Sequence, residues 1–220
     1  MNAGWGGRRV KADRDAGMTL VELIVAMGIF TVVIAVFMSG VVVMTKDTAR
    51  AQSVADAGDE VRRVFQRLDK EVRYASAINM PGTGTSGAYY VEYLMTAVEA
   101  GTQPTCIQWR YVPSSGTVQR RSWANVTAGV APSAWSTLAS RVRNKLPAER
   151  PFVFTKAGSV NTNQQLRVFL DVGPGTNKGA QLDSQFVARN TDTSTTTNAD
   201  VDNNGASDSP VCQQPGTGRP

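Results

Sequence analysis

Histidine is absent from the 220-residue chain, and cysteine nearly so, with only Cys106 and Cys212. Without histidine the chain has no histidine general base, no Ser-His triad and no His-ligated zinc ion. The formal net charge of +5 is modest, and part of it lies in the first seventeen residues, where four basic residues outnumber two acidic ones. The remaining positive charge is too small to indicate nucleic acid as a partner.

Charged residues are also missing from Leu23 to Met44, a run of twenty-two residues. As a helix rising about 1.5 Å per residue, this run is long enough to cross the hydrocarbon core of a membrane, which is about 30 Å thick. Basic residues precede the run, so we expect a single-pass protein of the cytoplasmic membrane with its N-terminus inside and its C-terminal part exported. A cleaved secretory signal would have a shorter apolar core and a small-residue cleavage site, which "VVVMTKD" does not offer.

Glu22 lies inside the apolar sequence "AGMTLVELIVAMGIF". A charge at mid-membrane costs from about 2.5 kcal/mol upward, so such residues usually have a functional role or a partner. A plain membrane anchor does not account for this carboxylate. The glutamate therefore predicts a positively charged group that meets it.

The residues around Glu22 resemble the N-terminal signal of type IV prepilins and type II secretion pseudopilins. The resemblance rests on a short basic leader, Gly17, the sequence "MTLVE" at 18–22 and the apolar run that follows. It implies that a prepilin peptidase cleaves between Gly17 and Met18 on the cytoplasmic side, and that Met18 is then N-methylated. It further implies that Glu22 pairs with the new terminal ammonium of a neighbouring subunit during assembly on a platform in the inner membrane.

The implied function is that of a structural subunit rather than an enzyme, in a filament at the cell surface or in the periplasm or cell wall. The sequence departs from the family pattern in two ways, because Met18 replaces the commoner phenylalanine and no proline lies between Met18 and Ile78. The absent proline favours a minor subunit that initiates or caps the filament. The stretch "RRVFQRLDKEVRYAS" also resembles the J-type minor pseudopilin. The alternative is a signal-anchored extracytoplasmic binding module that is not assembled into a filament.

A single helix is predicted from Met18 to Ser76, because no helix breaker occurs before Pro81. Its second half has charged residues on one face and an apolar stripe on the other, and a sheet must cover that stripe. The predicted fold is therefore α+β and pilin-like, with a long helix packed on an antiparallel sheet. The stripe is expected at Val54, Gly58, Val61, Phe65, Leu68, Val72 and Ala75.

The expected organisation has five parts. They are a leader at 1–17, a membrane and assembly helix at 18–45, an amphipathic helix at 46–79, a sheet domain at 80–190 and a polar, flexible tail at 191–220.

Six strands are predicted in the sheet domain from β-branched and aromatic runs. The sequence "CIQWRYVPSSGTVQRRSW" is typical of a hairpin with its turn at 113–116, and residues 134–146 are predicted as a short helix ended by Pro147. The predicted strands are Ala88–Met95, Cys106–Val112, Thr117–Trp123, Phe152–Phe154, Leu166–Val172 and Phe186–Arg189.

The tail has almost no apolar residues and cannot order itself by burying surface. Cys212 is the candidate anchor, because two cysteines in an exported region are free to form a disulfide with each other. A bond between Cys106 and Cys212 would hold the tail to the sheet, and two free thiols are the alternative.

The sequence "DVDNNG" at 200–205 matches the first half of a calcium loop, with oxygen ligands at alternate positions and a glycine at the turn. The twelfth position is Val211 instead of glutamate, so the site is incomplete. The candidate calcium ligands are Asp200, Asp202, Asn204 and Asp208.

Aromatic and arginine residues alternate in the predicted hairpin, and Trp135 follows it. A DNA-binding surface is one interpretation. Alternation along "QWRYV" places its aromatic residues and Arg110 on opposite faces, so we expect core aromatics beneath a solvated arginine edge. The residues concerned are Trp109, Tyr111, Trp123, Trp135, Arg110, Arg120 and Arg121.

Overall fold

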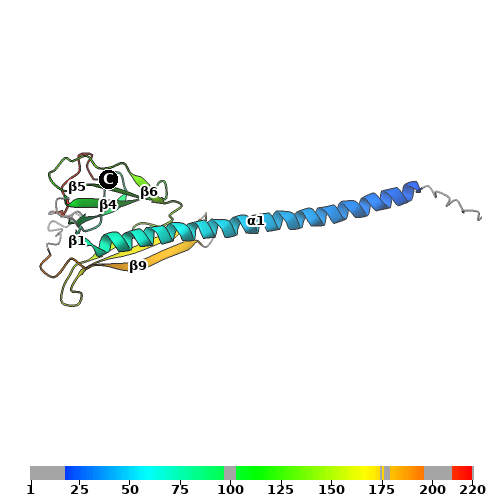
Figure 1. Ribbon diagram of the computed structural model, residues 1–220. Coiled ribbons are helices and arrows are strands. Elements are labelled where there is room, and N and C mark those ends of the chain that lie inside the picture. The colour runs from blue at the N-terminus through cyan, green and yellow to red at the C-terminus, as the bar shows by residue number, and fades with distance from the viewer. Residues whose placement is uncertain (1–17, 97–102, 174, 176–178, 196–209, 220) are drawn as a thin grey trace, which may run out of the picture. The chain divides into compact units, whose positions relative to one another are not determined.

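A computed structural model describes residues 18–96, 103–173, 175, 179–195 and 210–219. The chain forms two compact units, Met1–Ala49 and Arg50–Pro220. The helix α1 spans Leu20–Arg73 and so contributes to both. It is followed by strands that form two antiparallel sheets, in the α+β, pilin-like arrangement that the sequence predicts (Figure 1).

The larger sheet has the order β1-β3-β4-β5-β6, and β2 pairs with β3 beside β1. The predicted hairpin is confirmed as β4 and β5, which are joined by a turn at 113–116. Gly116 has a positive φ of 59°, and a Cβ there would lie 2.9 Å from the carbonyl oxygen of Val142. The strands are β1 Ala75–Ile78, β2 Gly82–Thr83, β3 Tyr89–Met95, β4 Thr105–Val112, β5 Thr117–Ala124 and β6 Ser136–Ala139.

The smaller sheet has the order β7-β8-β9. Its strands are β7 Phe152–Thr155, β8 Gln164–Val172 and β9 Ala180–Ala188, so β9 begins earlier than predicted. Both sheets contribute to one apolar core with the second part of α1, where Trp109, Phe152 and Leu166 are fully buried. Figure 1 shows β9 running beside this part of the helix.

The helix ends at Arg73, three residues before the predicted end at Ser76. Residues 75–78 instead pair with β3, and Ser76 donates a hydrogen bond to the carbonyl oxygen of Leu94. The carbonyl oxygen of Arg73 accepts a bond from the backbone N–H of Arg189, which satisfies one group at the helix end. Pairing with a distant strand therefore replaces the last turn that local sequence favours.

The buried stripe of α1 is offset from the predicted one. Leu68 and Val72 are buried as predicted, whereas Phe65 is 41% exposed and contacts the ring of Phe186 in β9. Ala57 and Val64, which the prediction did not include, are buried. The helix therefore presents a face rotated towards these two residues.

The prediction of a helix at 134–146 is wrong. Ser136–Ala139 forms β6 on β5, and Val142 makes a β-bridge to Val172 in the other sheet. Asn144 is buried, and its side chain donates to the carbonyl oxygen of Phe169 at 2.8 Å. Hydrogen bonds to both sheets outweigh the local helical preference of this segment.

Candidate functional site

The start of α1 is capped by its own sequence. Thr19 is the N-cap residue, and its Oγ1 accepts a hydrogen bond from the backbone N–H of Glu22 at 3.3 Å. Thr-x-x-Glu is the capping-box spacing, and an acid in the first turn also favours the positive end of the helix dipole. Glu22 therefore has a local structural role in addition to the one that its sequence motif implies.

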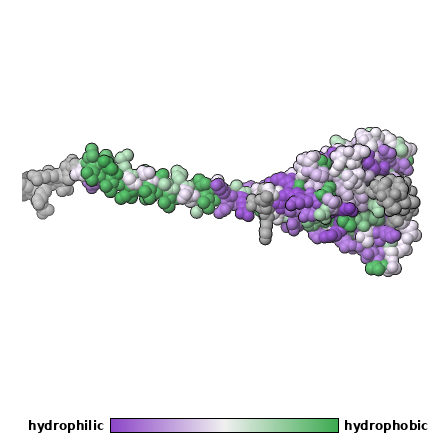
Figure 2. All heavy atoms as spheres, turned by 180° about the vertical axis from the view of Figure 1, so that it is seen from behind, coloured by the Kyte–Doolittle hydropathy of each residue, from purple (hydrophilic) through white to green (hydrophobic). Residues whose placement is uncertain are grey.

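The apolar run after Glu22 is a continuous helix, and no other described residues bury its side chains. Every residue from Met18 to Arg50 is exposed, and Figure 2 shows apolar side chains gathered along this part of α1. By length and composition, this helix can cross a membrane. A helix of this kind is what a membrane-anchored, single-pass protein requires.

Hydroxyl groups in this segment are satisfied within the helix. Thr31 donates to the carbonyl oxygen of Met27 at 2.8 Å, and Ser39 donates to that of Val36 at 2.7 Å. An unsatisfied hydroxyl in hydrocarbon would be costly, and these internal bonds remove that cost. The helix also continues through Ser39 and Gly40 without a break.

The second part of α1 is fastened to the larger sheet by one carboxylate, Glu71. Its Oε2 accepts hydrogen bonds from Tyr93 Oη at 2.5 Å and from Trp109 Nε1 at 3.2 Å. Its Oε1 accepts from Arg120 Nε at 2.9 Å and from Arg67 Nε at 3.0 Å. Three adjacent strands, β3, β4 and β5, each supply one of these donors.

The hydrogen-bonding capacity of the Glu71 carboxylate is fully used. Each oxygen receives two donors, which is what its lone pairs accept. Burial raises the pKa of Tyr93 well above its ordinary value, and the Glu71 charge adds to the rise. Tyr93 therefore stays a hydrogen-bond donor to Glu71 over the whole physiological range.

On the other face of the larger sheet, residues 210–219 form a segment that we call the C-terminal strap. The predicted disulfide between Cys106 and Cys212 is confirmed, with the two Cα atoms 5.8 Å apart. Trp123 Nε1 donates to the carbonyl oxygen of Gln213 at 3.0 Å. This part of the predicted flexible tail is thus held by a covalent bond and by hydrogen bonds.

A second buried carboxylate, Glu92 in β3, binds the strap. It accepts hydrogen bonds from Asn79 and Gln108 and from the guanidinium of Arg219, whose Nε lies 3.0 Å from Oε1. Burial raises the pKa of the Glu92 carboxyl, and the Arg219 charge opposes that rise. The sequence interpretation singled out neither Glu71 nor Glu92, although each interrupts an apolar pattern.

The prediction that the arginine side chains are solvated is wrong for two of the three, Arg120 and Arg121. Trp109, Tyr111 and Trp123 are buried as expected, but Arg120 reaches Glu71 and Arg121 is only 4% exposed. The expectation of a core position for Trp135 is also wrong, because this residue precedes β6 and lies half-buried.

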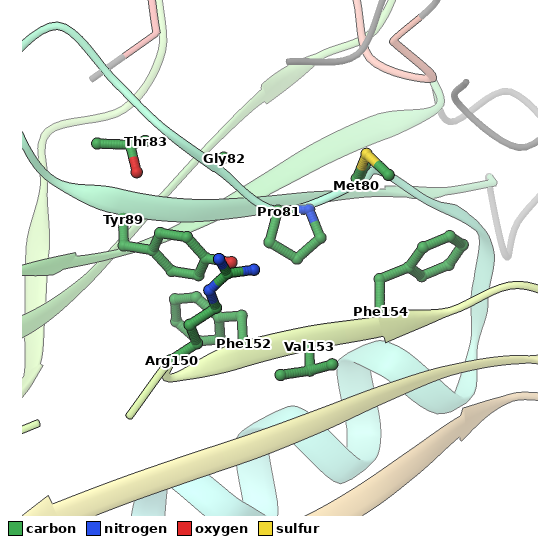
Figure 3. Close-up of a pocket in the computed structure, with 9 residues that line it drawn as sticks. All are labelled: Met80, Pro81, Gly82, Thr83, Tyr89, Arg150, Phe152, Val153 and Phe154. Atoms are coloured by element: carbon green, nitrogen blue, oxygen red, sulfur yellow. The ribbon is translucent and has the colours of Figure 1, made fainter. Parts of the chain in front are cut away.

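A pocket of about 380 Å³ lies between β2, β3 and β7 (Figure 3). The rings of Tyr89 and Phe152 stack in it with centroids 6.4 Å apart, and Figure 3 places the Arg150 guanidinium beside the Tyr89 hydroxyl. Burial raises the pKa of Tyr89, and Arg150 opposes the rise. The described lining contains no carboxylate or thiol, so we regard it as a packing junction.

The remaining sequence-predicted residues are placed as follows. Met18 and Glu22 are exposed at the start of α1. Gly17 and the calcium candidates Asp200, Asp202, Asn204 and Asp208 lie outside the described residues. Within the residues that the structure does describe, no group of three or more acidic or cysteine side chains could hold a metal ion.

Comparison with known families gives a match in the N-terminal segment of the chain. No curated protein and no solved structure matches the chain. The family model for the prokaryotic N-terminal methylation motif matches residues 13–38, which include Gly17, Met18, the capping box and the first part of the apolar helix. This match supports a pilin- or pseudopilin-like precursor, a structural subunit that a prepilin peptidase processes and that assembles with other pilins. The chain thus carries a prepilin-type N-terminal methylation signal at the start of an α+β, pilin-like fold.

Proposed function

We propose that this protein is a minor pilin or pseudopilin that helps to initiate or cap a type IV pilus-like or type II secretion pseudopilus filament. The observation that carries the proposal is the methylation motif at residues 13–38, which runs into the first part of α1, where the apolar side chains are uncovered. The minor role rests on the absence of proline between Met18 and Ile78 and on the resemblance of "RRVFQRLDKEVRYAS" to the J-type minor pseudopilin.

The proposed sequence of events begins in the cytoplasmic membrane, with residues 1–17 inside and the sheet domain exported. Prepilin peptidase cuts between Gly17 and Met18, and Met18 is methylated. The apolar helix then moves from lipid into a filament on the inner-membrane platform, where its apolar surface stays covered. Glu22 meets the terminal ammonium of a neighbouring subunit, so a carboxylate in an apolar setting gains a counter-charge.

Processing is tested first, by co-expression of the full chain with a prepilin peptidase. We expect mass spectrometry to find a chain that begins at Met18 and carries one methyl group on its terminal nitrogen. Gly17→Ala should abolish the cleavage, because the peptidase must accommodate this residue beside the scissile bond. Gly7→Ala, a glycine change elsewhere in the leader, should be cleaved normally. An intact leader in the wild-type chain would instead favour the signal-anchored binding module.

Assembly is tested by separating the charge of Glu22 from the helix cap that Thr19 forms. Glu22→Gln keeps the capping-box spacing and removes the charge, whereas Thr19→Ala removes the cap at a cost of about 1 kcal/mol and keeps the charge. We expect Glu22→Gln to be processed but absent from sheared filaments, and Thr19→Ala to be incorporated. Equal incorporation of the two variants would contradict the intermolecular pair.

A further inference from the structure

Arg121 is a buried cation whose hydrogen bonds all go to neutral acceptors in the described part of the chain. Its Nε donates to Gln108 Oε1 at 2.6 Å, and its terminal nitrogens donate to Thr217 Oγ1 and to the carbonyl oxygen of Gly218. Its residue is only 4% exposed. Buried charges are usually paired with an opposite charge, and here the Glu92 carboxylate, whose charge acts on Arg121, is hydrogen-bonded to Arg219 instead.

A second arginine lies beside the first. The guanidinium carbon of Arg110 is 3.8 Å from the ring centroid of Trp135, and that of Arg121 is 4.4 Å from the same centroid. Because both guanidinium carbons lie this close to one ring centroid, the two cations are neighbours of each other. Burial, with repulsion from Arg110 second, lowers the pKa of Arg121 to about 10. Among the described residues, the charge of one carboxylate, Glu92, therefore faces three guanidinium groups, those of Arg110, Arg121 and Arg219.

These groups line one pocket of about 340 Å³ on the strap side of the larger sheet. Arg110, Arg121 and Arg219 come from β4, β5 and the strap, and Trp135 and Pro132 complete the wall. Within the described residues, the side chain of Arg110 donates one hydrogen bond, from Nε to Gln119 Oε1. The N–H groups on its two terminal nitrogens therefore remain able to donate to a ligand. The pocket is larger than the roughly 30 Å³ that one water occupies.

We propose that this pocket binds a tetrahedral oxyanion, a phosphate or sulfate group, between Arg110, Arg121 and Arg219. Guanidinium groups form strong, charge-assisted hydrogen bonds to such oxygens, and three of them arriving from separate elements suit a tetrahedral acceptor. The anion supplies a negatively charged acceptor for Arg121, which no described carboxylate provides by a hydrogen bond. Trp135, whose ring faces the guanidinium groups of Arg110 and Arg121, forms part of the pocket wall and helps to hold both cations in place. This site is independent of the N-terminal signal and of filament assembly.

The test uses the full chain in a non-ionic detergent, with inorganic sulfate and inorganic phosphate as the probes. Isothermal titration calorimetry should show saturable binding of either anion that chloride at equal ionic strength does not reproduce. Arg110→Gln should weaken the affinity by roughly tenfold or more, because it removes one charged donor group. Lys156→Gln, which removes one exposed charge elsewhere on the same unit, should leave the affinity unchanged.

Other outcomes overturn the proposal. Equal losses in Arg110→Gln and Lys156→Gln would show a general charge effect instead of a site. No saturable heat in the wild-type chain would show that the pocket is closed to anions or filled by the chain's own carboxylates. A response to acetate equal to that for sulfate would contradict the tetrahedral preference. Near-ultraviolet circular dichroism checks that each variant is folded, and Arg110→Lys should recover part of the affinity.

Discussion

Replacing Glu71 by alanine is expected to destabilise the unit Arg50–Pro220 by about 3–5 kcal/mol, the usual cost of removing one partner of a buried ion pair. The side chain of Glu71 is only 10% exposed, and that of Arg120 is 16% exposed, so solvent screens their interaction weakly. Alanine also leaves Tyr93 Oη and Trp109 Nε1 without their acceptor inside the core. Buried donors without partners add to the loss.

The measurement is urea denaturation of the full chain in detergent, followed by near-ultraviolet circular dichroism. Asp69→Ala is the matched control, since Asp69 also forms an ion pair on α1, with Arg73, but both partners are more than a third exposed. An exposed pair contributes about 0–1 kcal/mol, so the control should unfold close to the wild-type midpoint. Glu71→Gln keeps one acceptor oxygen and should lie between the two. A midpoint for Glu71→Ala equal to that of Asp69→Ala would refute the anchoring role.

Glu71 also shows what the sequence could and could not predict. It stands seven residues after Val64 and three after Leu68, on the apolar stripe, and a carboxylate in an apolar stripe is the same signal that drew attention to Glu22. That signal predicts a buried acid in need of partners. It does not name Tyr93, Trp109 and Arg120, because strand order and register depend on pairings between distant residues.

The elements themselves were predictable to different degrees. The helix and the β4–β5 hairpin follow from local patterns, which are long and strongly periodic. Residues 134–146 were not predictable, because their conformation depends on hydrogen bonds from Ser140 to Glu60 and from Asn144 to Phe169, which lie on other elements. The anion pocket was equally hidden, since it needs β4, β5 and the strap to meet on one face.

Removing the disulfide is expected to have the other large effect. Cys106 and Cys212 are separated by 106 residues in the sequence, and on the chain-entropy model a cross-link of that length stabilises the folded state by up to about 4–5 kcal/mol. Both residues are buried beside Trp123, so the strap would also lose a packed contact. Cys212→Ser and Cys106→Ser should each lower the urea midpoint, and reductant should lower that of the wild-type chain.

The three treatments break one bond, which supplies an internal control. The double variant should lie close to the single variants, because the second substitution breaks no further covalent bond and only replaces one buried thiol with a hydroxyl. Loosening the strap also withdraws Arg219 from Glu92 and from the anion pocket. We therefore expect sulfate binding to weaken in the disulfide variants, while leader cleavage between Gly17 and Met18 is unaffected. Wild-type stability in the double variant would show that noncovalent contacts alone hold the strap.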